Sequence, residues 1–302
     1  MLSLTREFRR FRRGVRFVLR HPLARRHRAA ALKRYVLFHV THMLLPRPRV
    51  YPWVGPLELI AYRGGGPDPA NIYTGLPDLE VMSFLVHFLR AGDLFVDVGA
   101  NAGTYSLLAS GICGAKSIAV EPVPSTFSDL QANVSLNNLR HLVTCINAAV
   151  GSSAGQLRVT SRLGSMNRVL LDGETTGDEG VWVEAVRLDD LLDGQFPAAI
   201  KIDTEGYEFQ VLAGASRSLA CQSCHAVVVE TLFGARYGHC DSELHAILAN
   251  HGFAPSAYDP FTRRVHQPSG PLGFNWLYLR DLEAISARIA DAPPLRVLNV
   301  AL

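Results

Sequence analysis

The sequence lacks any apolar run long enough to cross a bilayer, for which about 20 apolar residues are needed. Its longest apolar stretch, YVLFHVTHMLL at Tyr35–Leu45, has eleven residues and includes His39 and His42. The basic start of the chain is not followed by an apolar segment with a small-residue cleavage site. We therefore expect neither a transmembrane helix nor a signal peptide.

Cysteine is also scarce, with five residues scattered over a chain of 302. They are Cys113, Cys145, Cys221, Cys224 and Cys240. Five dispersed cysteines do not make a disulfide framework in a chain of this size, so they indicate a reducing compartment. We expect a cytoplasmic protein, or one attached peripherally to the inner face of the membrane.

Phosphate-binding signatures are absent from the segment where they would be expected. The segment DLFVDVGANAGTYSLLAS, Asp93–Ser110, is typical of a buried strand, a loop of small residues and a helix start. Its loop, Gly99–Gly103, lacks the middle and third glycines of a dinucleotide-binding loop, and the chain has no G-K-[ST]. These absences disfavour a nicotinamide-dependent oxidoreductase and a Walker-type nucleotide site.

Negative charge is almost missing from the first 49 residues. They hold 14 of the 30 Lys and Arg residues but only one acid, Glu7, so this arm carries +13 and the remainder −10. The pattern predicts one or two basic helices, broken at His21-Pro22. Apolar residues recur there at spacings of three and four, with arginines between them: Leu2, Leu4, Phe8, Phe11, Val15, Val18 and Leu19.

This pattern favours an anionic membrane surface as the partner of residues 1–45. The alternatives are a helix docked on the acidic body, a solvated tail and a nucleic-acid-binding tail. We expect no nucleic-acid partner, because the body is acidic and carries no aromatic-basic motif.

From Leu94 onward, strand-like runs alternate with helical stretches. The runs are LFVDVG, SIAVEP, LVTCINAAVG, AAIKIDTEG and AVVVETL, with NWLYLR near the end. Such alternation predicts an α/β fold with a mostly parallel sheet and helices on both faces. LRVTSR and VWVEAVRL alternate with period two and predict an inserted hairpin. We expect four parts: a helical arm (1–49), a strand and helix extension (50–92), the main domain (93–285) and a C-terminal tail (286–302).

Several polar residues fall at the carboxyl ends of these strands, where such sheets bind ligands. Asp97 can accept hydrogen bonds from an ammonium group, and Asn101 can donate and accept. Glu121, 22 residues beyond Gly99, suits two ribose hydroxyls. An ammonium, a nucleoside and no required phosphate describe S-adenosylmethionine. The alternative, that Asp97 caps the helix after Gly103 and Glu121 is a surface acid, is less favoured because both stand at strand tips.

Four motifs in this order resemble the FkbM family of S-adenosylmethionine-dependent methyltransferases: FVDVGANAGTYS, AVEPVPSTFSDLQANVSLNN, NAAVGSSAGQL and IKIDTEGYEFQVLAGA. The resemblance covers about residues 70–280, and I-K-I-D-x-E-G-x-E is its most specific part. It implies a Rossmann-like class I methyltransferase fold with a mostly parallel seven-stranded sheet, and methylation of hydroxyl groups on sugars or macrolide-type products. The cofactor residues that it implies are Asp97, Gly99, Asn101, Gly103, Thr104 and Glu121, with Asn147 and Ala148 at the edge of the adenine pocket.

The segment KIDTEGYE supplies the candidate catalytic residues. On a strand, Lys201, Asp203 and Glu205 would point the same way, which places two carboxylates where the methyl group should be. We expect Asp203 to act as the base or to orient the hydroxyl, with Glu205 second and Glu230 third. For Glu208, stabilisation of a helix start is the better interpretation. No metal-ligand spacing is present, and we expect no metal.

LGSMNRVL, at 163–170 in the inserted hairpin, either folds over the substrate or is a surface loop. The sequence as a whole predicts an O-methyltransferase that uses S-adenosylmethionine and acts on a hydroxyl of a sugar, glycolipid or polyketide-like metabolite. Its partner is thus a small-molecule, glycan or glycolipid acceptor. The rival from another class is a non-catalytic, membrane-recruited scaffold with a retained nucleoside pocket. Methylation of nucleic acid is disfavoured, since no Asn/Asp-Pro-Pro-Tyr/Phe element is present.

Overall fold

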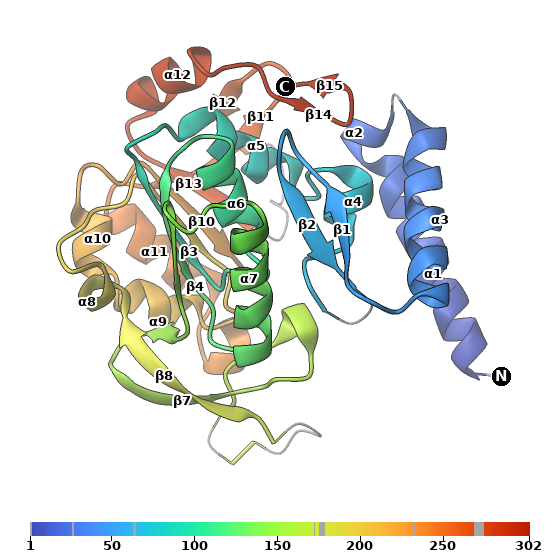
Figure 1. The fold of residues 1–302 in the computed structure, drawn as a ribbon. Helices are drawn as coiled ribbons and strands as arrows, with labels where there is room; N and C mark the ends of the chain where they lie inside the picture. The colour runs from blue at the N-terminus through green and yellow to red at the C-terminus, as the bar shows by residue number, and fades with distance from the viewer. Residues whose placement is uncertain are drawn as a thin grey trace.

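A mostly parallel sheet forms the centre of the structure (Figure 1). The computed structural model describes residues 2–25, 27–62, 65–171, 173–174, 179–231, 234–268 and 275–302, with side chains from residue 11 onward. Within these ranges, eight strands lie in the order β12-β11-β13-β10-β9-β3-β4-β5. Their bounds are Leu94–Val98 (β3), Lys116–Val120 (β4), Val143–Ile146 (β5), Ala199–Ile202 (β9), Ala226–Glu230 (β10), Ala254–Asp259 (β11), Arg264–His266 (β12) and Asn275–Leu279 (β13).

The directions of the strands confirm the predicted sheet. The pairs β3–β4, β4–β5, β3–β9 and β9–β10 are parallel, and β13 is antiparallel to both β10 and β11. Seven strands, numbered along the chain, therefore lie in the order 3-2-1-4-5-7-6. All of them run parallel except strand 7, which is β13. The short edge strand β12 is an eighth strand, which the sequence did not indicate.

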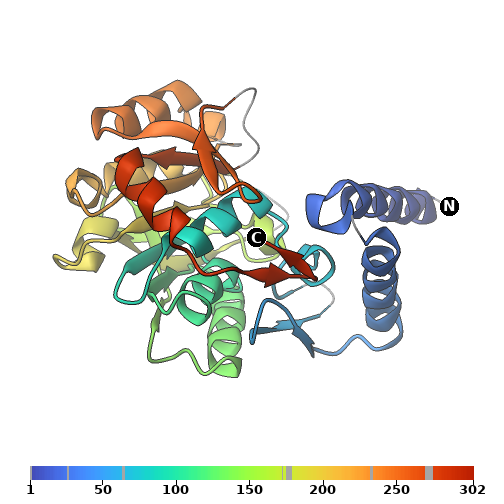
Figure 2. The ribbon, with the colours of Figure 1, turned by 90° about the horizontal axis from the view of Figure 1, so that it is seen from above.

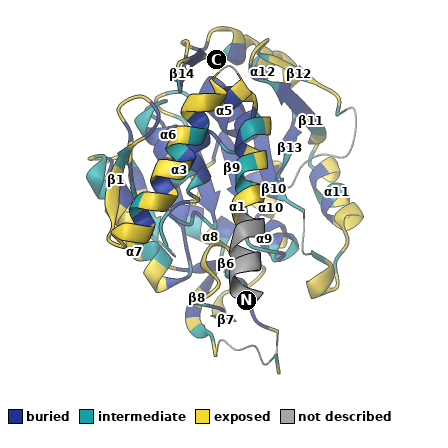
Figure 3. Ribbon diagram, turned by 90° about the vertical axis from the view of Figure 1, so that its right-hand side faces the viewer, coloured by how far each residue is buried: buried dark blue, intermediate teal, exposed yellow. Residues whose placement is uncertain are grey.

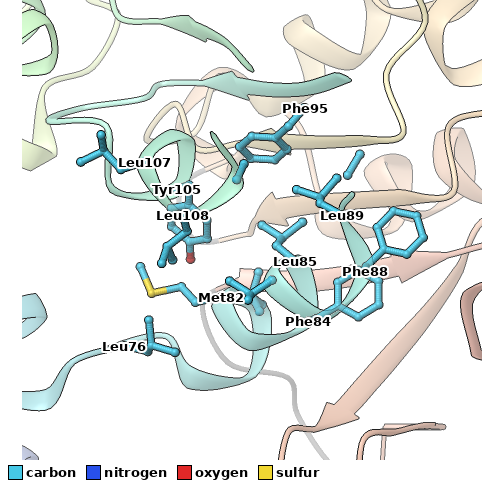
Figure 4. Packing of buried hydrophobic residues seen from close by; sticks show 14 of the residues in the cluster. Leu76, Met82, Phe84, Leu85, Phe88, Leu89, Phe95, Tyr105, Leu107 and Leu108 are labelled. Atoms are coloured by element: carbon cyan, nitrogen blue, oxygen red, sulfur yellow. The ribbon is translucent and has the colours of Figure 1, made fainter. Parts of the chain in front are cut away.

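Helices cover both faces of this sheet because its central strands are apolar on both sides. Along β3, Phe95 belongs to the cluster on one face and Val96 to the cluster on the other. The first face is covered by α5 (Leu79–Phe88), α6 (Thr104–Gly111), α7 (Pro124–Leu136) and α12 (Leu282–Ala290). The second is covered by α8 (Leu188–Leu192), α9 (Glu208–Ala213), α10 (Ser216–Ala220) and α11 (Asp241–Asn250). Figure 4 shows side chains of α5 and α6 gathered beside Phe95.

A small sheet stands apart from the main one and holds the predicted hairpin. Its strands are β6 (Ala149–Gly151), β7 (Gly155–Val159) and β8 (Val181–Arg187), and the antiparallel pairing of β7 with β8 confirms the hairpin. The prediction of one strand over 142–151 was wrong. β5 ends at Ile146, the chain turns at Asn147, and β6 pairs with β8 in the small sheet instead.

The basic arm folds into α1 (Leu2–Arg20), α2 (Pro22–Arg25) and α3 (Arg28–Leu44), with the predicted break at His21-Pro22. These helices form a layer on one side of the molecule (Figures 1 and 2). Val18 of α1 is fully buried against Tyr35 of α3 and Tyr73 of α4 (Ala70–Thr74), and Val15 packs against the same cluster. Val15 and Val18 therefore face the rest of the protein, as the alternative of a docked helix predicts for this part of α1. Among the described residues, no helix is long and apolar enough to cross a membrane.

The remaining elements join the arm and the end of the chain to the core. Hairpin β1–β2 (Arg49–Pro52 and Glu58–Ala61) lies beside α7, where the side chain of Asn137 bonds the backbone of Glu58. The end of the chain forms β14 (Arg296–Val297) and β15 (Val300–Ala301), and Leu302 is buried in the main core. Two 3-10 turns complete the fold at Gly164–Met166 and Gly234–Tyr237. The helix α12 runs across the boundary expected at 285/286. The four-part division of the chain stays a prediction.

Candidate active site

A cavity of about 530 Å³ lies at the carboxyl ends of the parallel strands, within the range usual for small-molecule sites. The loop after β3 forms one wall, and the ends of β4, β9 and β10 contribute Glu121, Asp203 and Glu230. Gly164–Val169 of the insertion supplies several lining residues, so the segment 163–170 lies over this cavity and is not a remote surface loop. Phe17 of α1 also lines it.

The glycine loop is shaped by its own neighbours. Gly99 has a φ of +75°, and an added Cβ there would lie 1.8 Å from the backbone oxygen of Asp203. Its lack of a side chain thus allows the loop to pass the end of β9, and Gly99 also lines the cavity. At Gly103, an added Cβ would lie 2.5 Å from Cδ1 of Leu130 in α7, and Gly103 itself does not line the cavity. Thr104 does line it, at the start of α6.

Glu121 is buried rather than a surface acid, with 6% of its surface exposed. Its two carboxylate oxygens accept hydrogen bonds from the backbone N–H groups of Asn101 and Val123, both at 3.0 Å. Burial raises the pKa of Glu121 to about 7, against the lowering effect of these two bonds. Each oxygen keeps a further lone pair, so the side chain is held in place and can still accept from a ligand.

Asn147 and Ala148 differ in position. The Asn147 amide donates to the backbone oxygens of Glu121 and Pro122, at 2.8 and 2.9 Å, and the residue is exposed outside the cavity. Ala148 is buried and lines the cavity together with Val150. The turn therefore places one apolar wall beside Glu121, while Asn147 braces that wall from outside.

Asp97 lies behind the cavity and is 1% exposed. One carboxylate oxygen accepts from the Ser106 backbone N–H at 3.2 Å and from its hydroxyl at 2.8 Å, so Asp97 does hold the first turn of α6. Its other oxygen, Oδ1, is buried without a partner among the described residues. Burial raises the pKa of Asp97, although the Lys201 ammonium opposes this. A ligand ammonium would satisfy that oxygen, directly or through water.

Three carboxylates meet in the cavity where β9 and β10 end, next to the glycine loop. Asp203, Glu205 and Glu230 each place an oxygen within 4.8 Å of the others. Strand alternation does not explain this, because β9 ends at Ile202 and Glu205 adopts a left-handed φ of +55°. The turn after β9 and the parallel neighbour β10 bring the three acids together. Oxygens at this spacing could hold a divalent cation or surround a hydroxyl.

A buried lysine lies beside the three acids, and the charges of these groups influence one another. Lys201 is buried, and its Nζ lies 2.8 Å from Oδ2 of Asp203 and 4.7 Å from the ring centre of Tyr105. Burial would lower the pKa of Lys201, but the neighbouring carboxylates Asp203 and Asp97 raise it overall. Burial and then the charge of Asp203 raise the pKa of Glu205 to about 7. The same causes raise the pKa of Glu230 well above its ordinary range.

Glu208 does not share this cluster. Its Oε1 accepts hydrogen bonds from the Thr204 backbone N–H (2.8 Å) and hydroxyl (2.9 Å) and from the Gly206 N–H (3.1 Å). Glu208 therefore holds the turn that carries Asp203 and Glu205, whereas its stabilisation of the start of α9 stays a prediction.

Several lining residues carry no signal in the sequence. Asp78, at the start of α5, accepts hydrogen bonds from the Tyr105 hydroxyl at 2.7 Å and the Asn275 amide at 2.8 Å. Asn71 of α4 is 2% exposed and lines the cavity, and its Oδ1 has no partner among the described residues. Arg168 brings a positive charge from the insertion and pairs with Glu174 at 3.2 Å. These residues line the cavity with polar and charged groups.

The strand order, a glycine loop after the first strand and a buried acid at the tip of the second define a Rossmann-like class I methyltransferase fold. A family model, the methyltransferase FkbM domain, matches residues 97–255, which is more than half of the chain. The protein therefore belongs to the FkbM methyltransferase family.

Two characterised proteins are similar over part of their length. The hexuronic acid methyltransferase AglP of Haloferax volcanii is 29% identical over 159 residues, which are 50% of this chain and 61% of that protein. The methyltransferase sdnD of Sordaria araneosa is 30% identical over 200 residues, covering 55% of this chain and 75% of sdnD. The chain thus spans less than two thirds of the length of AglP.

Solved structures match at low scores. The methyltransferase FkbM of Methylobacillus flagellatus KT aligns with a TM-score of 0.42 and 18% identity, covering 62% of this chain and 43% of that one. SMU.1697c of Streptococcus mutans, a putative methyltransferase in complex with SAH, aligns with a TM-score of 0.39 and 11% identity, covering 66% and 93%.

Proposed function

We propose that the protein is an S-adenosylmethionine-dependent O-methyltransferase that acts on a hydroxyl of a sugar, glycolipid or polyketide-like metabolite. The observation that carries this proposal is one cavity with two chemically different ends. A glycine loop and a buried strand-tip acid form one end, and three carboxylates with a lysine form the other. Membership of the FkbM family and similarity to a hexuronic acid methyltransferase support it.

The residues at the first end fit S-adenosylmethionine, which when bound supplies an electrophilic methyl group. Glu121 would accept hydrogen bonds from the ribose hydroxyls through its remaining lone pairs. Oδ1 of Asp97 gives the ligand ammonium a partner, and Ala148 offers an apolar wall for the adenine. Asn101 and Thr104 would contact the cofactor from the loop. Gly99 and Gly103 would act through the shape of the loop, and Asn147 would act by bracing the wall that Ala148 forms.

At the second end, we assign the acceptor hydroxyl to the space between the three carboxylates. Lys201 engages one oxygen of Asp203, which leaves the other oxygen to orient the hydroxyl in line with the methyl group. When the acceptor oxygen gains the methyl group and S-adenosylhomocysteine is left, the hydroxyl proton would pass to a carboxylate. Glu205 suits this step because its pKa of about 7 matches a base that works near neutral pH. Glu230 is the third candidate.

The proposed acceptor class rests on the polar residues that line this cavity. Asn71, Asp68 and Asp78 line it with groups that bind hydroxyls, and Arg168 adds one cationic group that suits an acidic sugar. We further propose that the protein works in the cytoplasm, on the inner face of the membrane. The five free cysteines and the basic arm support this setting.

Calorimetric titration of S-adenosylmethionine, S-adenosylhomocysteine and NAD into the purified chain tests the cofactor. We expect the first two to bind and Glu121→Ala to weaken them at least about tenfold, since a buried hydrogen-bonding group is lost. Glu184→Ala, an exposed acid on β8, is the matched control and should bind normally. Binding of NAD alone would contradict the proposal. Binding without transfer to any glycan or glycolipid hydroxyl would favour the scaffold.

A further inference from the structure

The outward side of α3 is apolar, although nothing within the described residues covers it. Leu37, Met43 and Leu44 are 59%, 65% and 67% exposed. We call the outer face of α3 the set Val36, Leu37, Val40, Met43, Leu44 and Leu45, all exposed. Spacings of three and four place the helical members on one stripe. The opposite stripe is buried against the body through Ala31, Tyr35, Phe38 and His42.

An apolar helix face of this size is unusual on a water-exposed surface. Trp182 and Phe261 are also exposed, but each is a single side chain on another element. Six apolar residues within ten positions of the chain form a continuous surface instead. Figure 3 looks at this side of the molecule and shows the exposed stripe of α3 facing outward.

Positive charge lies on the helix beside α3 and just beyond the end of α3. Arg13, Arg16 and Arg20 of the neighbouring α1 are exposed, on the side of that helix opposite the buried Val18. Arg47 and Arg49 are exposed just beyond the end of α3. The chain has no acidic residue between Glu7 and Glu58, so the arm contains no counter-charge of its own over that span.

We propose that the outer face of α3 and these arginines form a binding surface for an anionic lipid bilayer. Apolar side chains would enter the boundary between head groups and acyl chains, while the arginines would pair with lipid phosphates. A second copy of the chain fits less well, because pairing two such faces would bring two arginine rows together. An acidic protein partner would leave the apolar stripe without a matching surface.

The surface corrects the sequence-based interpretation of the arm. The periodicity of α1 points to α1 as the inserted helix, but its residues Val15 and Val18 face the body. In the structure α3 presents the apolar face and α1 presents charge. Phe17 of α1 also lines the cavity, so the bilayer would lie against the same layer of helices that closes the candidate active site.

Vesicle co-sedimentation with the full chain tests this surface. We expect binding to phosphatidylcholine vesicles that contain one third phosphatidylglycerol, weaker binding at high salt and little to phosphatidylcholine alone. Leu37→Ser/Leu44→Ser should weaken binding at least about tenfold, since two large apolar side chains no longer insert. The charge variant Arg13→Gln/Arg16→Gln/Arg20→Gln should weaken it too and reduce its dependence on salt.

The matched control is Phe261→Ser/Leu282→Ser, which removes two apolar residues of 46% and 44% exposure away from the arm. It should bind vesicles like the wild type, and thermal unfolding should show that all variants fold. Absence of binding to anionic vesicles, or equal loss in the control, would overturn the proposal. So would a dimer that the leucine changes convert to monomer while vesicle binding persists. Cofactor titration without vesicles is independent of this surface, so its failure would concern the proposed function alone.

Discussion

Substitution of Gly99 by alanine tests whether the glycine loop and the end of β9 are packed as one unit. The added Cβ would lie 1.8 Å from the backbone oxygen of Asp203, and the residue must also keep a φ of +75°. Backbone atoms cannot rotate away as a flexible side chain can, so either the loop or the end of β9 must move. We expect a loss of both stability and cofactor affinity.

The expected magnitude has two parts. A left-handed backbone costs an L-residue about 1–2 kcal/mol relative to glycine. Forced overpacking adds about 1–3 kcal/mol, so we expect the free energy of unfolding of Gly99→Ala to fall by about 2–5 kcal/mol. Gly92→Ala is the matched control, because Gly92 has a φ of +93° and open space around its Cβ position. Only the first part applies to it.

Urea unfolding followed by circular dichroism measures both variants against the wild type. The midpoint should shift further for Gly99→Ala than for Gly92→Ala, with similar slopes. The folded fraction of Gly99→Ala should also bind S-adenosylhomocysteine more weakly, whereas Gly92→Ala should bind normally. Equal losses of stability in the two variants would refute the argument that the Asp203 carbonyl is what restricts position 99.

Three further predictions concern the acidic residues. The value of kcat/KM should rise with pH through about 7, where Glu205 loses its proton. Glu205→Gln should abolish this rise and reduce the rate about 10²-fold or more. An unchanged pH profile in the variant would exclude Glu205 as the base. Glu208→Ala should lower the free energy of unfolding by about 3 kcal/mol by leaving turn N–H groups unbonded, whereas exposed Glu283→Ala should have little effect in the same urea titration. Because burial raises the pKa of Glu121 to about 7, the folded state binds more protons than the unfolded state above pH 4.5, the usual value for this group. Its contribution to stability therefore falls as pH rises from there through 7, and a wild type minus Glu121→Gln difference that grows with pH would contradict this.

Local sequence signals indicated that the residues proposed to bind the cofactor would lie at one edge of the sheet. Gly99, Asp97 and Glu121 stand at the ends of runs that are apolar over a few residues, and neighbouring parallel strands end at one edge of the sheet. For the same reason Asp203 and Glu230 could be expected to meet, since β9 and β10 are adjacent. The reasons assigned to single residues were less secure. Gly99 is needed by the Asp203 carbonyl, and Asp97 holds α6 with one of its oxygens.

The sequence alone determined the alternation of strands and helices, the break at His21-Pro22 and the acids at the strand tips, because each depends on residues within a few positions of one another. Only the tertiary structure decided the split of β5 from β6, the left-handed turn at Glu205 and which side of α3 is buried. It also brought Asn71, Asp78 and Arg168, which come from separate segments, to the lining of one cavity. Hydrophobic periodicity shows that a face is apolar. What covers that face depends on contacts between residues far apart in the chain, and these carry no local pattern.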